Sequence, residues 1–209
     1  SLNVSGTGEL TLRGSCTKEI NYPNGTVNLV DAVFSISSKY ACKINAKTIN
    51  LKSINENSKN GHLYTTGELN ILSNSPNYVL LKHTGTLNVK SDFNLYHGGI
   101  ITGDINISSG ATMTTYSFAH YDGVINNNGT LIINGTLPTN VLEHYGNEID
   151  SNRITLIGDI EDPVVINQDI EINKLYGNDS LYVQVDANVT FVDSKNINVI
   201  GSGEVTVQG

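Results

Sequence analysis

A short unit of an aliphatic, a polar and an aliphatic residue recurs along the whole chain, and it limits the possible folds more than any other feature. Its middle position is most often Asn or Thr, and a Gly or another turn residue usually precedes it. Successive side chains of a β-strand point to opposite faces, so each unit turns two aliphatic side chains inward and one polar side chain outward. The units lie at 10–12, 27–29, 49–51, 69–71, 87–89, 105–107, 131–133, 154–156, 170–172, 189–191 and 205–207.

Successive units begin 16 to 26 residues apart, with a mean of 19.5. This spacing is too sparse for antiparallel hairpins, which place two-residue Asn-Gly or Asp-Gly turns between paired strands. A unit that recurs at a similar interval, with a variable number and type of residues between its copies, is instead typical of a solenoid, in which each repeat is one turn of a coil. Turns that stack in parallel pair their backbone groups with the turn before and the turn after.

We therefore predict an all-β fold, a single-stranded β-solenoid of the right-handed parallel β-helix type with about ten to eleven rungs. Irregular spacing favours the right-handed form, whose corners accept insertions, and a left-handed β-helix or a β-sandwich is the alternative. Residues 1–209 are expected to form a single domain, a fragment of a longer chain because both ends read as strands. Segment 139–150 lacks clear alternation and is expected to hold a short helix or an excursion from the rod.

The outward middle residues of the units are expected to form a polar ladder along one face. Stacked Asn side chains can hydrogen-bond from one rung to the next. The residues beside them vary, so we interpret this face as a solvated strand face rather than a flat binding surface. The ladder positions are Thr11, Asn28, Asn50, Asn70, Asn88, Asn106, Thr155, Asn198 and Thr206.

Composition excludes several classes of partner. Apolar residues make up 38% of the chain, enough for a core, and charged residues only 15%. The formal net charge of −8 argues against nucleic acid, and against an anionic membrane, as the main partner, because either would require a basic face. No apolar run approaches the roughly 18 residues that a membrane span requires, so we expect no membrane insertion by this segment.

The chain resembles the passenger regions of bacterial autotransporters and related adhesin-like microbial surface proteins. The resemblance is compositional: a high content of Asn, Gly and Thr, very few cysteines, and phrases such as those at 126–131 and 134–137. It implies an extracellular or cell-surface stalk that acts in attachment without catalysis. The implied partners are a glycan or protein receptor on another cell and flanking domains of the same chain.

Histidine and tyrosine recur together at intervals of about one rung. His97, His120 and His144 each adjoin a tyrosine and lie 23 and 24 residues apart. Flat aromatic rings with polar tips suit stacking on sugar rings, so these pairs predict a ligand-binding strip. The alternative is that they are ordinary amphipathic side chains over loop edges. The predicted ligand-binding residues are Tyr96, His97, Tyr116, His120, Tyr121, Asp122, His144 and Tyr145.

No catalytic or metal-binding signature is present. The chain has no HxH, HxxxH or CxxC motif and no calcium-binding repeat, so we expect no metal and no cofactor. Asp104 and Asp122 could stack on neighbouring rungs as an acid–base pair, with Lys82 and Lys90 as the nearest cations in sequence. A pectate-lyase-like, polysaccharide-cleaving enzyme is therefore one alternative function. A purely structural, self-assembling spacer is the other.

Two cysteines, Cys16 and Cys42, leave two interpretations open. They could form one disulfide in an oxidising compartment, or remain two buried thiols.

Overall fold

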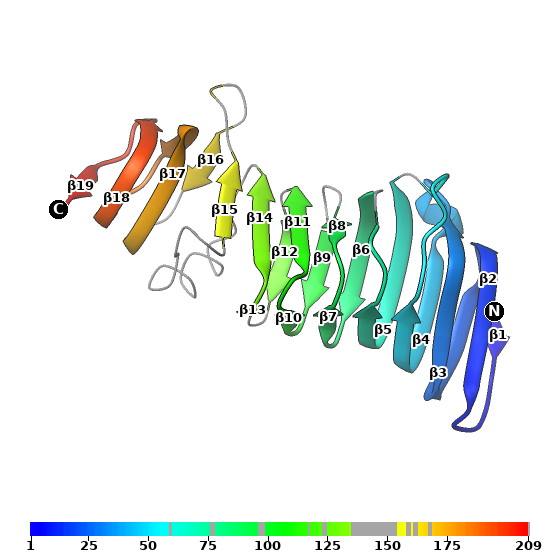
Figure 1. Cartoon of the computed structure of the whole chain (residues 1–209). Helices are drawn as coiled ribbons and strands as arrows, with labels where there is room; N and C mark the ends of the chain where they lie inside the picture. The colour runs from blue at the N-terminus through cyan, green and yellow to red at the C-terminus, as the bar shows by residue number, and fades with distance from the viewer. Residues whose placement is uncertain are drawn as a thin grey trace.

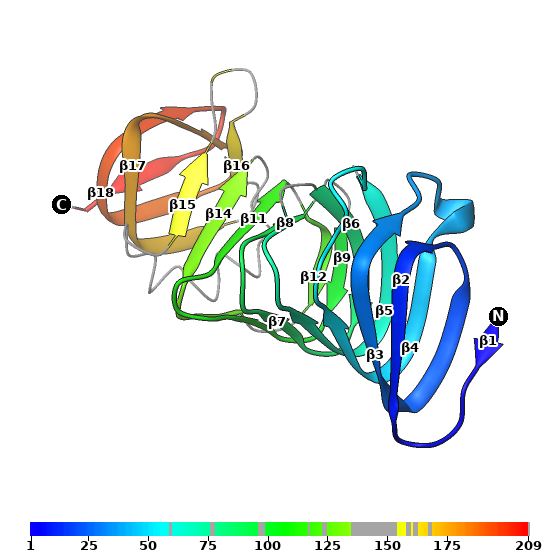
Figure 2. The same cartoon turned by 45° about the vertical axis from the view of Figure 1, so that its right-hand side comes forward.

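The chain forms an almost entirely β rod, a parallel β-solenoid of about eight turns with 2% helix (Figure 1). The computed structural model describes residues 1–58, 60–75, 78–95, 99–116, 118–122, 125–134, 154–157, 160, 163–166 and 169–208. Seen from the N-terminal end, the chain turns clockwise as it recedes, so the coil is right-handed (Figure 2). The predicted fold class is confirmed, with slightly fewer rungs than expected.

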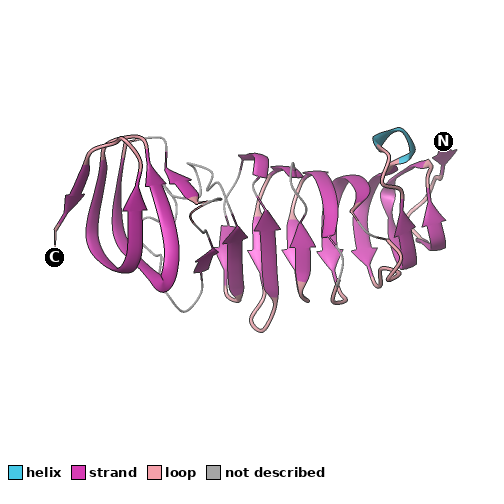
Figure 3. Ribbon diagram, turned by 90° about the horizontal axis from the view of Figure 1, so that it is seen from above, coloured by secondary structure: helices cyan, strands magenta, loops and turns pink. Residues whose placement is uncertain are grey.

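Every strand pair in the described residues is parallel, which excludes the hairpin-based sandwich for this part of the chain. Figure 3 shows the strands stacked along the rod. The first sheet contains fifteen strands: β1 Leu2–Asn3, β2 Glu9–Cys16, β3 Glu19–Phe34, β4 Cys42–Leu51, β5 Gly61–Ile71, β6 Tyr78–Thr84, β7 Leu87–Val89, β8 Phe93–Leu95, β9 Gly99–Thr102, β10 Ile105–Ile107, β11 Thr112–Tyr116, β12 Phe118–Asp122, β13 Ile125–Asn127, β14 Thr130–Asn134 and β15 Ile154–Ile157. The second contains four: β16 Val164–Ile166, β17 Ile170–Val185, β18 Val189–Ile200 and β19 Val205–Val207. A short 3₁₀ turn, η1 Ser38–Tyr40, lies between β3 and β4.

Strand segments of successive turns stack in rows. One row, here named the ladder row, runs from β2 through β3, β4, β5, β7 and β10 to β13. A second row joins β8, β11, β14 and β15. A third, the groove row, starts at β1 and continues through the first halves of β3, β4 and β5 to β6, β9 and β12. Inward aliphatic side chains fill the space between rows; Leu69, Leu87 and Phe93 are fully buried.

The strand register corrects one step of the predicted repeat. Ile105 pairs with Ile125, whereas the sequence pattern placed 131–133 next in the series. Leu131 instead pairs with Met113 in the second row. The unusually long 26-residue step therefore crosses from one row to another.

The predicted polar ladder is present from Asn28 to Asn106 and continues to Asn126, which was not predicted, whereas Thr155 pairs with Ile132 in the second row. Each Asn donates its side-chain Nδ2–H to Oδ1 of the Asn one turn earlier, at 2.8 to 3.2 Å. The series ends at Asn28, which donates to the carboxylate of Glu9 at 3.0 Å. Asn28 and Asn70 are buried, so the ladder is a structural column rather than a fully solvated face. Asn198 stands apart from it, bonding the carbonyl of Leu181.

Glycines form a second column at the corner between the groove row and the ladder row. Gly67, Gly85 and Gly103 have φ values of +118°, +128° and +120°. A Cβ on any of them would clash with the backbone carbonyl oxygen of the turn before, and for Gly85 that oxygen belongs to Gly67. Only glycine combines this backbone conformation with so close a stacking of turns.

Cys16 and Cys42 form a disulfide with their Cα atoms 5.1 Å apart. It links β2 to the start of β4, one turn later, beside the loop that carries η1. The disulfide interpretation of the two cysteines is therefore confirmed. Segment 139–150, where a helix or an excursion was expected, lies outside the described residues.

Candidate functional site

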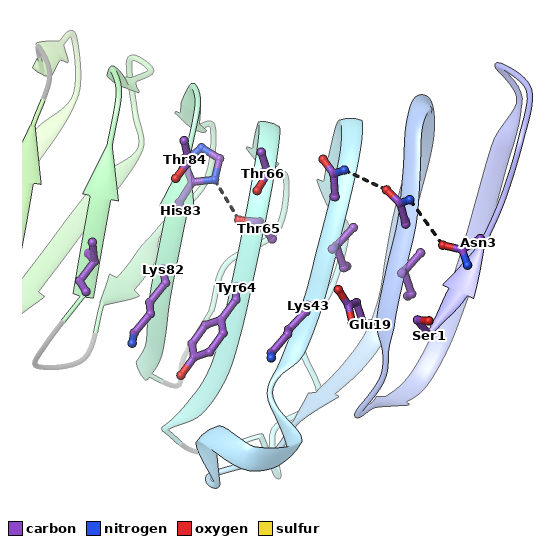
Figure 4. A pocket seen from close by; sticks show the side chains of 15 residues that line it. Ser1, Asn3, Glu19, Lys43, Tyr64, Thr65, Thr66, Lys82, His83 and Thr84 are labelled. Carbon is purple, nitrogen blue, oxygen red and sulfur yellow. Dashed lines mark hydrogen bonds between the residues drawn. The ribbon is translucent and has the colours of Figure 1, made fainter.

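The outward face of the groove row carries a candidate binding site. A shallow, open hollow of about 570 Å³ lies along it. Alternation along each strand sends every second side chain of this row outward, and parallel register aligns these side chains from turn to turn. The result is two parallel files of side chains, which Figure 4 shows.

The first file, here named the lysine–tyrosine file, contains Glu19, Lys43, Tyr64, Lys82 and Ile100. Strand register places each directly beside the next. Lys43 and Lys82 are exposed, and Tyr64 between them is half-buried. The long side chains of Lys43, Tyr64 and Lys82 extend side by side in one direction (Figure 4). One aromatic ring is thus flanked by two ammonium groups.

Tyr64 is held by contacts on two sides. Its hydroxyl lies 3.1 Å from Nδ1 of His62, and the two rings meet edge to face at 74°. Nζ of Lys82 lies 5.0 Å from the centroid of the Tyr64 ring, a cation–π distance. These contacts restrict the rotation of the ring before any ligand arrives, and restricted side chains lose less entropy on binding.

The second file, here named the amide–hydroxyl file, contains Asn3, Asn21, Asn45, Thr66 and Thr84. Asn45 donates to Asn21 at 2.9 Å, and Asn21 donates to Asn3 at 3.4 Å. An amide nitrogen has two hydrogens, so each Asn keeps a donor for a ligand. Thr66 and Thr84 add exposed hydroxyl groups, which both donate and accept. The file is suited to the hydroxyl groups of a sugar.

Beneath the files, His83 replaces an aliphatic residue in the inward row. It is buried, and its Nδ1 lies 2.9 Å from Oγ1 of Thr65. Its Nε2 has no partner among the described residues. Burial away from water lowers the pKa of His83 from 6.5 to about 4, against the opposing effect of backbone hydrogen bonds at Thr86, Thr65 and Gly85. The ring is therefore neutral at pH 7 and adds no charge to the groove.

Four of the predicted ligand-binding residues, Tyr96, His97, His144 and Tyr145, lie outside the described residues. The backbone of the other four, Tyr116, His120, Tyr121 and Asp122, is described. His120 pairs with Ile100 and Asp122 with Thr102, so β12 continues the register of the two files. Tyr121 pairs with Ile101 at an inward register position, and Tyr116 pairs with Asn134 in the second row. The proposed aromatic strip stays a prediction.

The register does not align Asp104 with Asp122. Asp122 lies across from Thr102, whereas Asp104 follows the glycine corner at Gly103 and precedes β10. The suggested stacking of these two aspartates is therefore wrong. Among the described residues that line the groove, Glu19 is the only carboxylate, and the described part of the chain contains no metal-binding group of three or more ligands.

Lys43 and Tyr64 are groove residues that the sequence patterns did not select. Lys43, Tyr64, Lys82 and Ile100 are 21, 18 and 18 residues apart, which is the period of the coil. Reading outward positions at that period would have found them. The sequence analysis instead selected histidines and tyrosines that are next to each other in the sequence.

A second hollow of about 500 Å³ lies over the second row, lined by Asn74, Ser75, Asp92, Asn94, Thr112 and Thr114. Its polar groups are used in bonds between turns. Asn74 accepts from the backbone N–H of Asp92 at 3.2 Å, and Asp92 accepts from that of Thr112 at 2.8 Å. These bonds fix the corners of the coil, and we assign this hollow a structural role.

Charge is distributed unevenly along the chain. Residues 1–90 contain nine Lys and Arg against five Asp and Glu, a balance of +4. Residues 91–209 contain three against fifteen, a balance of −12, and the two together give the net −8. The groove lies mostly on the basic part of the chain.

No family model matches this chain, and neither the curated proteins nor the solved structures contain a significant match to it. No helix in the described part of the chain is long and apolar enough to cross a membrane.

Proposed function

We propose that the chain is a segment of an extracellular or cell-surface attachment stalk that binds glycans without catalysis, and that the groove row is its binding face. The observation that carries the proposal is Tyr64, an aromatic ring fixed by His62 and Lys82 beside a file of exposed amide and hydroxyl groups. Sugar-binding sites commonly combine an aromatic platform with a few convergent polar groups.

The rod shape supports a role in attachment. Stacked turns hold the outward side chains at the strand spacing of about 4.8 Å, so the files run parallel to the rod axis. An extended glycan can lie along them and make several weak contacts. Repetition of such contacts raises the overall affinity without a deep pocket.

The composition of the groove supports binding rather than cleavage. Hydrolysis of a glycosidic bond ordinarily requires two carboxylates on either side of that bond. Glu19 is the only carboxylate among the described groove residues, and it stands at the edge of the file beside Lys43. We therefore propose that the groove binds its ligand without hydrolysing it.

A glycan array tests the proposal with the wild-type chain and Tyr64→Ala. The chain offers a matched control in Tyr40, an exposed tyrosine in η1 with Nζ of Lys39 at 5.4 Å from its ring centroid. Tyr40→Ala removes a similar Lys–Tyr pair away from the groove. We expect Tyr64→Ala to abolish array binding and Tyr40→Ala to retain it.

Two other outcomes would overturn the proposal. Release of new reducing ends from a bound polysaccharide would favour the enzyme. Absence of binding to any glycan, with ordered multimers in light scattering, would favour the structural spacer.

A further inference from the structure

We infer that the groove selects glycans that carry negative charge, through Lys43 and Lys82 on either side of Tyr64. This inference rests on the proposed glycan-binding function and specifies the ligand class of the same site.

The two ammonium groups are available to a ligand. Lys43 and Lys82 are exposed, and neither forms an ion pair with another described residue. The ammonium of Lys82 has three N–H donors, so its contact with the Tyr64 ring leaves donors for an anion. Glu19, next to Lys43, is the one opposing charge in the lysine–tyrosine file.

The spacing of the lysines defines the ligand further. They stand on β4 and β6, with Tyr64 on β5 between them. Two strand spacings separate their Cα atoms by about 9.6 Å. A ligand that reaches both lysines needs two anionic groups roughly one nanometre apart, joined by a stretch that contacts the tyrosine. A chain of acidic sugars meets this requirement.

The wider charge distribution favours the same ligand. The balance of +4 over residues 1–90 attracts an anionic chain toward the groove, and the balance of −12 over the remainder repels it. An anionic glycan is therefore directed to the basic part of the rod. A neutral glycan would experience no such preference.

The test measures dissociation constants by calorimetry for three probes of equal length. They are an oligosaccharide of galacturonic acid, the same oligosaccharide with its carboxylates reduced to alcohols, and a sulfated neutral oligosaccharide. The proteins are the wild-type chain, Lys43→Gln with Lys82→Gln, Lys43→Arg with Lys82→Arg, and the control Lys39→Gln with Lys52→Gln. Circular dichroism melting curves check that each variant is folded.

We expect the wild-type chain to bind at least one of the two charged probes at least tenfold more tightly than the reduced one. The double glutamine variant should weaken that binding by about tenfold, because each exposed charge pair contributes up to about fivefold. Raising the salt concentration should weaken it as well. The arginine variant and the control should bind like the wild-type chain. Preference between carboxylate and sulfate then identifies the source of the charge.

Equal binding of the charged and reduced probes would overturn the inference and leave the proposed glycan binding in place. So would unchanged binding by the double glutamine variant. Absence of binding to all three probes, with no signal on the array, would overturn the proposed function itself.

Discussion

The side-chain amide of Asn106 donates to Oδ1 of Asn88 across 2.8 Å, and the same bond joins each Asn of the ladder to the one a turn earlier. All the Nδ2 groups point toward the N-terminal end, so the amide dipoles are aligned. Glu9 accepts the last of these bonds, and its negative charge faces the positive end of the column. Aligned hydrogen bonds polarise one another, and a charged acceptor strengthens the final bond.

Asn70→Ala interrupts this column at a buried position. Asn70 donates to Asn50 at 3.2 Å and to Glu68 at 3.2 Å, and it accepts from Asn88 at 3.1 Å. The change leaves these polar partners with fewer bonds in a partly buried site, so the free energy of unfolding should fall by about 2 kcal/mol. Urea unfolding measures it. Thr11→Ala is the control, because Thr11 occupies the same row, is exposed and makes no side-chain bond to another described residue; equal losses would contradict the role of the column.

Gly85→Ala tests the glycine column. The new Cβ would meet the carbonyl oxygen of Gly67, and the residue would have to keep a φ of +128°. Strain and a forced backbone shift together should lower the free energy of unfolding by about 3 kcal/mol. Gly8→Ala is the matched control, because its Cβ would lie 3.5 Å from the hydroxyl of Tyr22 in ordinary contact. A thermal shift no larger than that of the control would show that the turns can separate without cost.

Removing the disulfide should destabilise the N-terminal turns. Cys16 and Cys42 are 26 residues apart, and closing a loop of that length restricts the unfolded chain by about 3.5 kcal/mol in the chain-entropy treatment. Cys16→Ser with Cys42→Ser should therefore lower the melting temperature, and a reducing agent should do the same to the wild-type chain. The double variant should not respond to the reducing agent. A wild-type chain that melts at the same temperature with and without it would contradict this role.

The sequence was informative about the fold because the same physical rule acts at every turn. A turn cannot bury its aliphatic side chains alone, so units such as 69–71 and 87–89 must recur at the length of the coil. Asn at the middle of these units predicted the ladder for the same reason. The seventh unit was misplaced because Leu131 lies in the second row, whereas Ile125 continues the ladder row. Composition does not distinguish one row from another.

The candidate site was harder to predict because it depends on register. Lys43, Tyr64 and Lys82 are distant in sequence and become neighbours only when the turns are aligned. The interval from Lys43 to Tyr64 is three residues longer than that from Tyr64 to Lys82, since turns differ in the length of their corners. Sequence adjacency drew attention to other His–Tyr neighbours, and the alignment of Tyr64 with the lysines required the structure.

His83 should make stability depend on pH. Its pKa is about 4 in the folded chain and 6.5 in the unfolded chain, so between these values the unfolded chain binds a proton that the folded chain excludes. The stabilisation is fully present above pH 6.5 and is lost as the pH falls toward 4, by about 3 kcal/mol in total. Urea unfolding of the wild-type chain at pH 7 and pH 4.5 measures most of this change.

His83→Leu with Thr65→Val removes both polar partners from the core and should reduce the loss of stability between these two pH values. Replacing both side chains by apolar groups removes the polar side-chain pair together with the protonation site, so the double variant should be at least as stable as the wild-type chain at pH 4.5. His62→Gln is the control, because it replaces a half-buried histidine on the outward face and leaves His83 in place. The carboxylates are the same in all three proteins, so the difference between variants isolates His83. An unchanged pH dependence in the double variant would show that protonation of this ring does not limit the stability of the coil.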